Sequence, residues 1–168
     1  MIAMRVYVGL GSNLEHPRRQ LARAMRALAR LPRTRFVGVS SNYVSAPLDC
    51  PGPQPEFVNA VAALETTLPP RGLLTQLFAI ERRQRRARRR PRNAPRTLDL
   101  DLLLYGRTRL RNPRLVIPHP RMGERAFVLR PLVELAPDVT IPGRGLARAL
   151  LPAVRAQRTA RTRTHLGR

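Results

Sequence analysis

The sequence predicts an α+β fold in which helices pack on a mostly antiparallel sheet. Its hydrophobic periodicity follows the order strand, helix, strand, strand, helix, strand and then a further helix, which favours this class. The chain of 168 residues is 43% hydrophobic, which is enough for a single domain with a real core. Stretches rich in proline and glycine separate the periodic segments and mark the connections between them.

Three strands and one helix are predicted in the first part of the chain. Residues 5–11 form a short apolar run that ends at a pair of glycines. Over residues 17–31 apolar side chains recur every three or four positions behind a proline in the first turn, which predicts a helix. Residues 34–44 alternate and residues 57–66 are nearly all apolar, so both are predicted strands. The proline-rich segment 45–56 between them is too long for a hairpin turn and is a candidate binding loop.

A helix, a strand and a second helix are predicted in the remainder. Residues 69–86 carry apolar side chains in helical phase, and the prolines of residues 87–95 prevent the helix from continuing. The apolar run 97–105 predicts the next strand. Residues 112–125 are predicted to be a loop, and residues 126–135 a helix.

The chain is predicted to consist of one domain over residues 1–154 and a basic tail over residues 155–168. The tail has no hydrophobic periodicity and is therefore expected to be disordered. The first residues are typical of a strand rather than of a signal peptide, and either Met1 or Met4 could be the initiator.

The composition limits the classes of function. The formal net charge of +22 suits a nucleic-acid partner, and a basic RNA- or ribosome-associated protein is the competing class. However, every basic residue is arginine, as expected also from codon drift, and only 4% of residues are aromatic, which leaves few rings to stack on bases. No run of 18 uncharged apolar residues occurs, so no membrane span is expected. Cys50 is the only cysteine, which predicts a cytoplasmic protein without disulfides or a thiolate metal cluster.

Two acidic residues lie within the apolar strand predicted over residues 97–105. Because side chains at positions i and i+2 of a strand share a face, Asp99 and Asp101 should project together, away from the leucines between and around them. Two adjacent carboxylates repel each other unless a cation lies between them or one is protonated. Mg²⁺ takes one or two carboxylates together with phosphate oxygens and waters, so a magnesium site is one interpretation. Ion pairs with neighbouring arginines are the alternative.

A dense arginine cluster immediately precedes these carboxylates and favours phosphate chemistry. Arg86, Arg88, Arg92 and Arg96 lie in or next to a segment that prolines keep out of regular structure, and guanidinium groups bind phosphate in a bidentate manner. We expect residues 85–96 to be open in the free protein, because their like charges repel, and to close when a phosphate ligand binds. Such a site suits phosphoryl or pyrophosphoryl transfer, whereas a phosphate-binding regulator without turnover would not need two carboxylates.

Four segments together resemble a known enzyme family. The segments are "YVGLGSNL", "FVNAVAALET", "PRTLDLDLLLY" and "IPHPRMGERAFVLRPLVELAP". They are similar to those of 6-hydroxymethyl-7,8-dihydropterin pyrophosphokinase of folate biosynthesis. The resemblance implies transfer of pyrophosphate from ATP to the pterin hydroxymethyl group with release of AMP. It also implies a single-domain, ferredoxin-like αβα sandwich and two Mg²⁺ ions, and we expect a monomer with no membrane partner and no dedicated nucleic-acid partner.

The resemblance also implies roles for individual residues. Asp99 and Asp101 correspond to the metal carboxylates, and Arg86 and Arg96 to further catalytic groups. The pterin-binding set is Ser45, Leu48, Phe57, Asn59 and Phe127. The ATP-binding set is Glu81, Arg86, Arg88, Arg96, Arg114, His119 and Arg125.

Each of these roles has a simpler structural alternative when the residue is considered alone. Phe57 and Phe127 could be core residues, and His119 an ordinary loop residue, whereas Asn59 within an apolar strand must be hydrogen-bonded to some group. Two features depart from the pattern of the family. Asn93 stands where some members have an aromatic residue, and the segment 45–53 is a variant of the usual pterin loop.

Overall fold

The structure is a computed structural model that describes residues 2–13, 16–45, 56–86 and 98–162. The strands are β1 (Met4–Ser12), β2 (Thr34–Val39), β3 (Tyr43–Ser45), β4 (Phe57–Thr66), β5 (Asp99–Tyr105), β6 (Leu110–Asn112), β7 (Leu115–Ile117), β8 (Thr140–Ile141), β9 (Gly145–Leu146) and β10 (Thr159–Arg161). The α-helices are α1 (Pro17–Leu28), α2 (Pro70–Arg86) and α3 (Ala126–Leu135), and the 3₁₀ helices are η1 (Met122–Glu124) and η2 (Ala147–Val154). None of the described helices is long and apolar enough to cross a membrane.

The main sheet is antiparallel at every pairing and has the strand order β10-β3-β4-β1-β5, with β2 also paired to β4. Along the chain, the strand–helix–strand–strand–helix–strand unit β1-α1-β2-β4-α2-β5 places its strands in the spatial order β5-β1-β4-β2. This is the ferredoxin-like arrangement, and the predicted fold class is confirmed.

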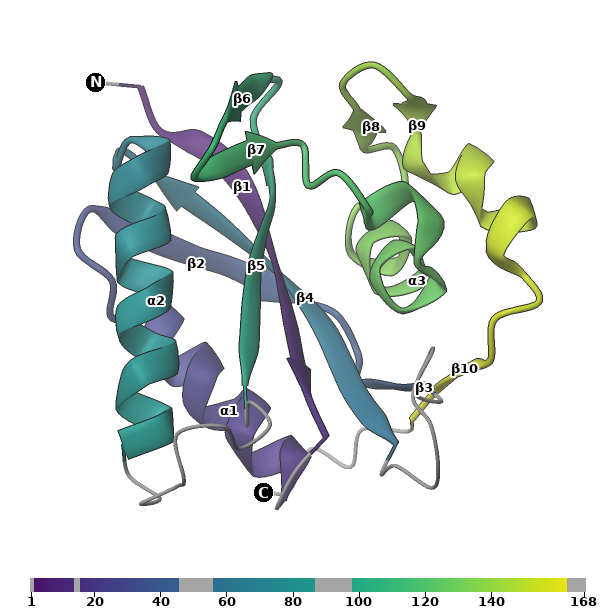
Figure 1. The fold of residues 1–168 in the computed structure, drawn as a ribbon, viewed down its shortest axis with the longest axis horizontal. Helices are drawn as coiled ribbons and strands as arrows, with labels where there is room; N and C mark the ends of the chain where they lie inside the picture. The colour runs from purple at the N-terminus through teal and green to yellow at the C-terminus, as the bar shows by residue number, and fades with distance from the viewer. Residues whose placement is uncertain (1, 14–15, 46–55, 87–97, 163–168) are drawn as a thin grey trace.

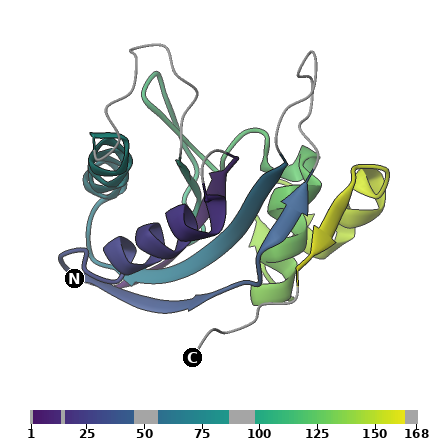
Figure 2. The same ribbon diagram turned by 90° about the horizontal axis from the view of Figure 1, so that it is seen from below.

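Helices cover both faces of the sheet (Figures 1 and 2). The core on one face joins apolar side chains of α1 and α2 to alternate residues of the strands, including Val8, Leu100 and Leu102. The core on the other face joins α3 and η2 to residues such as Val61 and Leu103. Each central strand therefore buries both of its faces, and this explains its nearly continuous apolar sequence.

The strand predicted over residues 34–44 is two strands. Ser40 interrupts it, because its backbone N–H donates to the carbonyl of Val61 and its Oγ accepts from the N–H of the same residue, both at 2.9 Å. As a result β2 pairs with one end of β4 and β3 with the other end. The break is a tertiary effect and is not visible in the alternation of apolar residues.

The structure corrects the sequence predictions at three further places. Helix α1 ends at Leu28 rather than residue 31, because Pro32 follows and cannot continue a helix. The predicted loop 112–125 contains the turn of the β6–β7 hairpin, the whole of β7 and also η1. Asn112 forms the hairpin turn by accepting hydrogen bonds from the N–H groups of Arg114 and Leu115. The predicted disordered tail is wrong for residues 155–162, because β10 pairs with β3; residues 163–168 lie outside the described part.

Candidate functional site

A cavity of about 520 Å³ opens on the face of the sheet that carries α3. Strands β1, β4 and β5 form its floor, and the segment from η1 into α3 forms one wall. The predicted site residues that line it are Ser45, Phe57, Asn59, Asp99, Asp101, Arg125 and Phe127. The structure therefore brings most of the predicted pterin residues and both predicted metal carboxylates into a single space.

Two glycines of β1 create the room between the amide and the carboxylates. Gly11 pairs with Asn59 of β4 on one side and with Asp99 of β5 on the other, and Gly9 occupies the same position relative to Asp101. A Cβ atom at Gly11 would lie 3.0 Å from Oδ1 of Asn59. Both glycines are within β1 rather than in a turn, and they leave the part of the floor that β1 forms free of side chains.

A hydrogen bond between the side chains of Asn59 and Ser45 fixes the Asn59 amide in the cavity. Its Nδ2 donates to Oγ of Ser45 over 2.9 Å, and the two residues are 5% and 4% exposed. A buried amide needs partners for its remaining donor and acceptor atoms, and Asn59 lines the cavity and forms no other side-chain hydrogen bond with the described residues. The Asn59 amide is thus oriented to read the edge of a planar polar ligand.

Two phenylalanine rings line the same cavity. Phe57 starts β4 and Phe127 lies in the first turn of α3, and both are half-buried rather than buried like the core residues. The guanidinium carbon of Arg125 lies 5.5 Å from the centre of the Phe127 ring, a cation–π contact that orients both groups. Two rings and an amide are suited to a flat heteroaromatic ligand.

The carboxylates of Asp99 and Asp101 both line the cavity, as the strand periodicity predicts. The described arginines form no ion pair with Asp101, so the alternative of a simple surface ion pair is not supported there. Within the described part of the chain, no cluster of three or more acidic, histidine or cysteine side chains could hold a metal ion. Two carboxylates are nevertheless the usual protein contribution to a Mg²⁺ site, whose other ligands are waters and phosphates.

His119 lies close enough to Asp101 for the two groups to interact electrostatically. Burial lowers the pKa of His119, the carboxylate of Asp101 opposes this shift, and the charges of Arg125 and Arg121 add to it. Nδ1 of the imidazole accepts a hydrogen bond from the N–H of Arg121 over 3.2 Å, and this leaves the proton of the neutral ring on Nε2. His119 can thus donate a hydrogen bond without adding a positive charge.

The segment that carries His119 also lines a second cavity of about 500 Å³. Residues of the β6–β7 and β8–β9 hairpins line it, together with His119 and Pro120. Arg109, Arg111 and Arg144 also line it. Sequence reasoning did not single out these three arginines, because they are dispersed among many others.

The other predicted site residues lie outside both cavities or outside the described residues. Glu81 of α2 is 7% exposed, and its Oε1 accepts a hydrogen bond from the N–H of Leu100 over 2.7 Å. Arg114 is exposed on the β6–β7 turn. Leu48, Arg88 and Arg96 lie outside the described residues, as does the side chain of Arg86, the last residue of α2.

Gln157 is a cavity residue that the sequence did not indicate. It lines the cavity from the segment between η2 and β10, which has no hydrophobic periodicity. Its side-chain amide donates to the carbonyl of Glu124 over 2.7 Å and accepts from the N–H of Ala126 over 2.9 Å. These two backbone groups flank Arg125.

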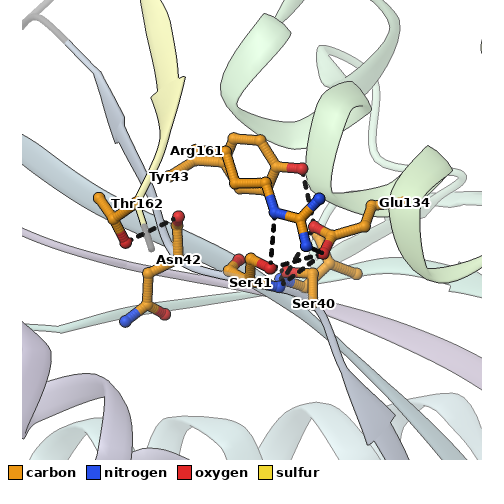
Figure 3. Close-up of polar contacts among 8 residues, drawn as sticks. Ser40, Ser41, Asn42, Tyr43, Glu134, Arg161 and Thr162 are labelled. Carbon is orange, nitrogen blue, oxygen red and sulfur yellow. Dashed lines mark hydrogen bonds and ion pairs between the residues drawn. The ribbon is translucent and has the colours of Figure 1, made fainter. Parts of the chain in front are cut away.

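A polar network at the start of β3 joins three separate segments of the chain (Figure 3). The carboxylate of Glu134 accepts hydrogen bonds from the hydroxyls of Ser41 (2.6 Å) and Tyr43 (2.7 Å). Arg161 of β10 pairs with the same carboxylate at 3.3 Å. Burial and the bond to Glu134 raise the pKa of Tyr43 to about 12. The network fixes the strand that ends at Ser45 in the cavity.

Comparison with known proteins identifies the family of this chain. A model of the family "7,8-dihydro-6-hydroxymethylpterin-pyrophosphokinase (HPPK)" matches residues 7–137. The chain belongs to this family. The Pseudomonas aeruginosa protein named 2-amino-4-hydroxy-6-hydroxymethyldihydropteridine pyrophosphokinase is 56% identical over 147 residues, which cover 87% of this chain and 90% of that protein. The Haemophilus influenzae protein of the same name is 50% identical over 136 residues, or 81% and 84% of the two chains.

Solved structures show the same HPPK fold at low sequence identity. A crystal structure of HPPK-DHPS in complex with substrates has a TM-score of 0.72 at 10% identity over 91% of this chain. A Plasmodium falciparum HPPK-DHPS structure has a TM-score of 0.71 at 14% identity over 90% of this chain. This chain spans 43% and 45% of the lengths of those two chains.

Proposed function

We propose that this member of the HPPK family transfers pyrophosphate from ATP to the hydroxymethyl group of 6-hydroxymethyl-7,8-dihydropterin. The products are the pterin diphosphate and AMP, and the reaction belongs to folate biosynthesis. The observation that carries the proposal is the presence of an oriented amide, two aromatic rings and two carboxylates in one cavity of a family member.

The amide and the rings would bind the pterin. Phe57 and Phe127 would stack on the flat ring system, and the Asn59 amide would pair with its polar edge. Ser45 fixes the orientation of that amide and would contribute its backbone groups, together with Leu48. This set distinguishes a pterin from a ligand held by charge alone, since a buried amide rejects a ring edge that cannot satisfy it.

The carboxylates would hold Mg²⁺, and we propose two ions. The donor set fits, because Asp99 and Asp101 project from one face of β5 into the cavity and both are oxygen ligands. Bound Mg²⁺ would neutralise phosphate charge and orient the transferred group. The protein contributes by holding the two carboxylates at fixed positions on a strand whose other side chains are buried in the core.

Basic side chains would bind the nucleotide. Arg125 lines the cavity, and the neutral imidazole of His119 could donate a hydrogen bond from Nε2 to a phosphate oxygen. The second cavity, which is lined by His119 and three arginines, would take the rest of the nucleotide. The resemblance to the family also assigns nucleotide contacts to five further residues. Three of them, Arg86, Arg88 and Arg96, belong to the loop that we propose closes over ATP. The other two, Arg114 and Glu81, remain proposed ATP-binding residues.

One coupled assay tests the proposal. AMP should form from ATP and Mg²⁺ only when the hydroxymethyl pterin is present, and the pterin product should gain the mass of a diphosphate. Formation of AMP without the pterin, or no AMP at all, would contradict it. We further propose that the chain acts as a monomer in the cytoplasm. Neither the family comparison nor the geometry of the site favours the alternative of an RNA-associated protein.

A further inference from the structure

We infer that Gln157 is a positioning residue for the pterin side of the cavity, a role that rests on the proposed function. Its side-chain amide joins the backbone groups on both sides of Arg125, and thereby sets the positions of Arg125 and Phe127. Gln157 lies 32 residues beyond Arg125 in the chain, so the contact is tertiary rather than local.

The two hydrogen bonds of the Gln157 amide lie at the start of α3, where backbone N–H groups have no partner within the helix. Arg125 is the N-cap of α3, has an extended backbone, and makes no side-chain capping bond. The first N–H groups of a helix have no partner within the helix, and arginine is not a residue that caps them well. Oε1 of Gln157 accepts from the N–H of Ala126 and supplies the missing cap. Nε2 of the same amide binds the carbonyl of Glu124, so the peptide groups before and after Arg125 are both fixed.

The segment that carries Gln157 is anchored on both of its sides. On one side, its backbone N–H donates to the carbonyl of Val154 at the end of η2 over 3.0 Å. On the other side, β10 begins two residues later and pairs with β3, with Thr159 opposite Ser45. The chain from Val154 to Thr159 therefore connects two walls of the cavity, one with Phe127 and Arg125 and one with Ser45 and Asn59.

This arrangement predicts a specific kinetic effect. Phe127 is one of the two rings that would stack on the pterin, and Arg125 lies against that ring. When the Gln157 amide is removed, the first turn of α3 loses its cap and the ring its fixed position, while Asp99 and Asp101 on β5 stay in place. The main loss should therefore be in binding, of the pterin through Phe127 and to a smaller extent of ATP through Arg125, rather than in the chemical step.

The test compares Gln157→Met with Val154→Ala. Methionine has nearly the same length and shape as glutamine but can form neither hydrogen bond. Val154 is 5% exposed in the core beneath η2, so its truncation destabilises the same segment without touching the cavity. The KM values for pterin and ATP and kcat are measured at a temperature at which both variants are folded by circular dichroism. Hydrogen exchange of the Ala126 amide is measured alongside.

Gln157→Met should raise the KM for the pterin about tenfold, equivalent to about 1.4 kcal/mol, and change kcat by less than about threefold. It should also accelerate exchange of the Ala126 amide. Val154→Ala should lower the melting temperature but leave the pterin KM within about twofold of wild type. An unchanged pterin KM in Gln157→Met, or an equal rise in Val154→Ala, would overturn the inference. The proposed function fails if the wild-type chain forms no AMP. The positioning role has its own test, because an unchanged rate of exchange of the Ala126 amide in Gln157→Met would overturn it whether or not AMP forms.

Discussion

Glu81 of helix α2 binds the backbone of Leu100, the residue that stands between the two aspartates of the cavity. The N–H of Leu100 donates to Oε1 of Glu81 over 2.7 Å, at the edge of β5 that does not pair with β1. A strand at the edge of a sheet has backbone groups without partners, and here a buried carboxylate serves one of them. Glu81 thus fixes the strand between Asp99 and Asp101.

Glu81→Ala should therefore reduce activity through the aspartates. Its removal leaves the Leu100 N–H without its partner in a buried place, and we expect a loss of about 1–3 kcal/mol in the free energy of unfolding. The kcat should fall and the Mg²⁺ concentration needed for half-maximal activity should rise. Glu65→Ala, which removes a partly exposed partner of Arg5 and Arg35, is the control and should leave both kinetic quantities unchanged. Equal kinetic effects of the two substitutions would contradict the role of Glu81.

Gly11→Ala should weaken pterin binding more than Gly9→Ala. The new Cβ at position 11 would lie 3.0 Å from Oδ1 of Asn59 and displace the amide, whereas at position 9 it would make ordinary contacts of 3.5 Å with the side chain of Leu103. We expect the pterin KM to rise about tenfold, or about 1.4 kcal/mol, in the first variant and clearly less in the second. Steady-state kinetics at saturating ATP measure this difference, and a larger effect at position 9 would disprove the account.

Asp99→Asn and Asp101→Asn should each abolish most of the activity without destabilising the fold. Both side chains face the cavity rather than the core, and an amide is a poor ligand for a hard cation. The kcat should fall on the order of a hundredfold or more. For Asp101→Asn the melting temperature should stay the same or rise, because one of two adjacent like charges is removed. Activity near that of wild type at ordinary Mg²⁺ concentration would refute the assignment.

Arg96→Ala should lower kcat more than it raises the KM for ATP. This prediction comes from the sequence alone, since Arg96 lies outside the described residues. A guanidinium that meets the phosphate as its charge rearranges stabilises the transition state more than the bound substrate. Arg90→Ala, in the same cluster but at a position with no counterpart in the family pattern, is the matched control. Similar losses in both variants would show that general charge, rather than position, matters.

Glu134→Gln should destabilise the protein at neutral pH and much less in acid. Burial raises the pKa of Glu134, but hydrogen bonds from Ser41 and Tyr43 and the charge of Arg161 outweigh it, so the pKa lies below its ordinary value of 4.5. A carboxylate of this kind stabilises the fold above its unfolded pKa, and the contribution is lost as the pH falls through the folded pKa.

Urea denaturation at several pH values tests this prediction. The difference in the free energy of unfolding between wild type and Glu134→Gln should be about 1–2 kcal/mol at pH 7 and should shrink as the pH falls below 4.5. Asp138→Asn is the control, since that carboxylate is 90% exposed and its ion pair with Arg148 should contribute little. A difference that does not vary with pH would mean that the charge of Glu134 is not responsible.

The elements that could be predicted from the sequence are those whose own periodicity decides their structure. Strand β4 and helix α3 have the predicted bounds, because a continuous apolar run and a helical repeat are local signals. The break between β2 and β3 and the strand β10 could not be predicted in this way. The first depends on the contact between Ser40 and Val61, and the second on pairing with the edge strand β3.

In the candidate site, too, local periodicity could be predicted from the sequence and tertiary contacts could not. The common orientation of Asp99 and Asp101 follows from the period of two along a strand, and the structure agrees with it. The roles of Glu81 and Gln157 toward the backbone could not be predicted, because each is a single hydrogen-bonded relationship between segments distant in the chain. Nothing in the spacing or composition around either residue indicates such a partner.

Asn59, Gly11 and Asp99 lie side by side on three neighbouring strands. This register restricts the length of the acceptor that the protein can bind together with ATP. Neighbouring strands lie about 4.8 Å apart, so the backbones that carry the amide and the carboxylates are about 10 Å apart, and backbone hydrogen bonding keeps them there. Replacing side chains at either end would change what is bound but not this separation. If the amide holds the ring and the aspartates hold the ions, as proposed, an acceptor whose hydroxyl lies further from its ring would present that oxygen at a different place along this fixed span. The length of the acceptor is therefore selected by the sheet itself, and a change in that preference would require a different strand between the two.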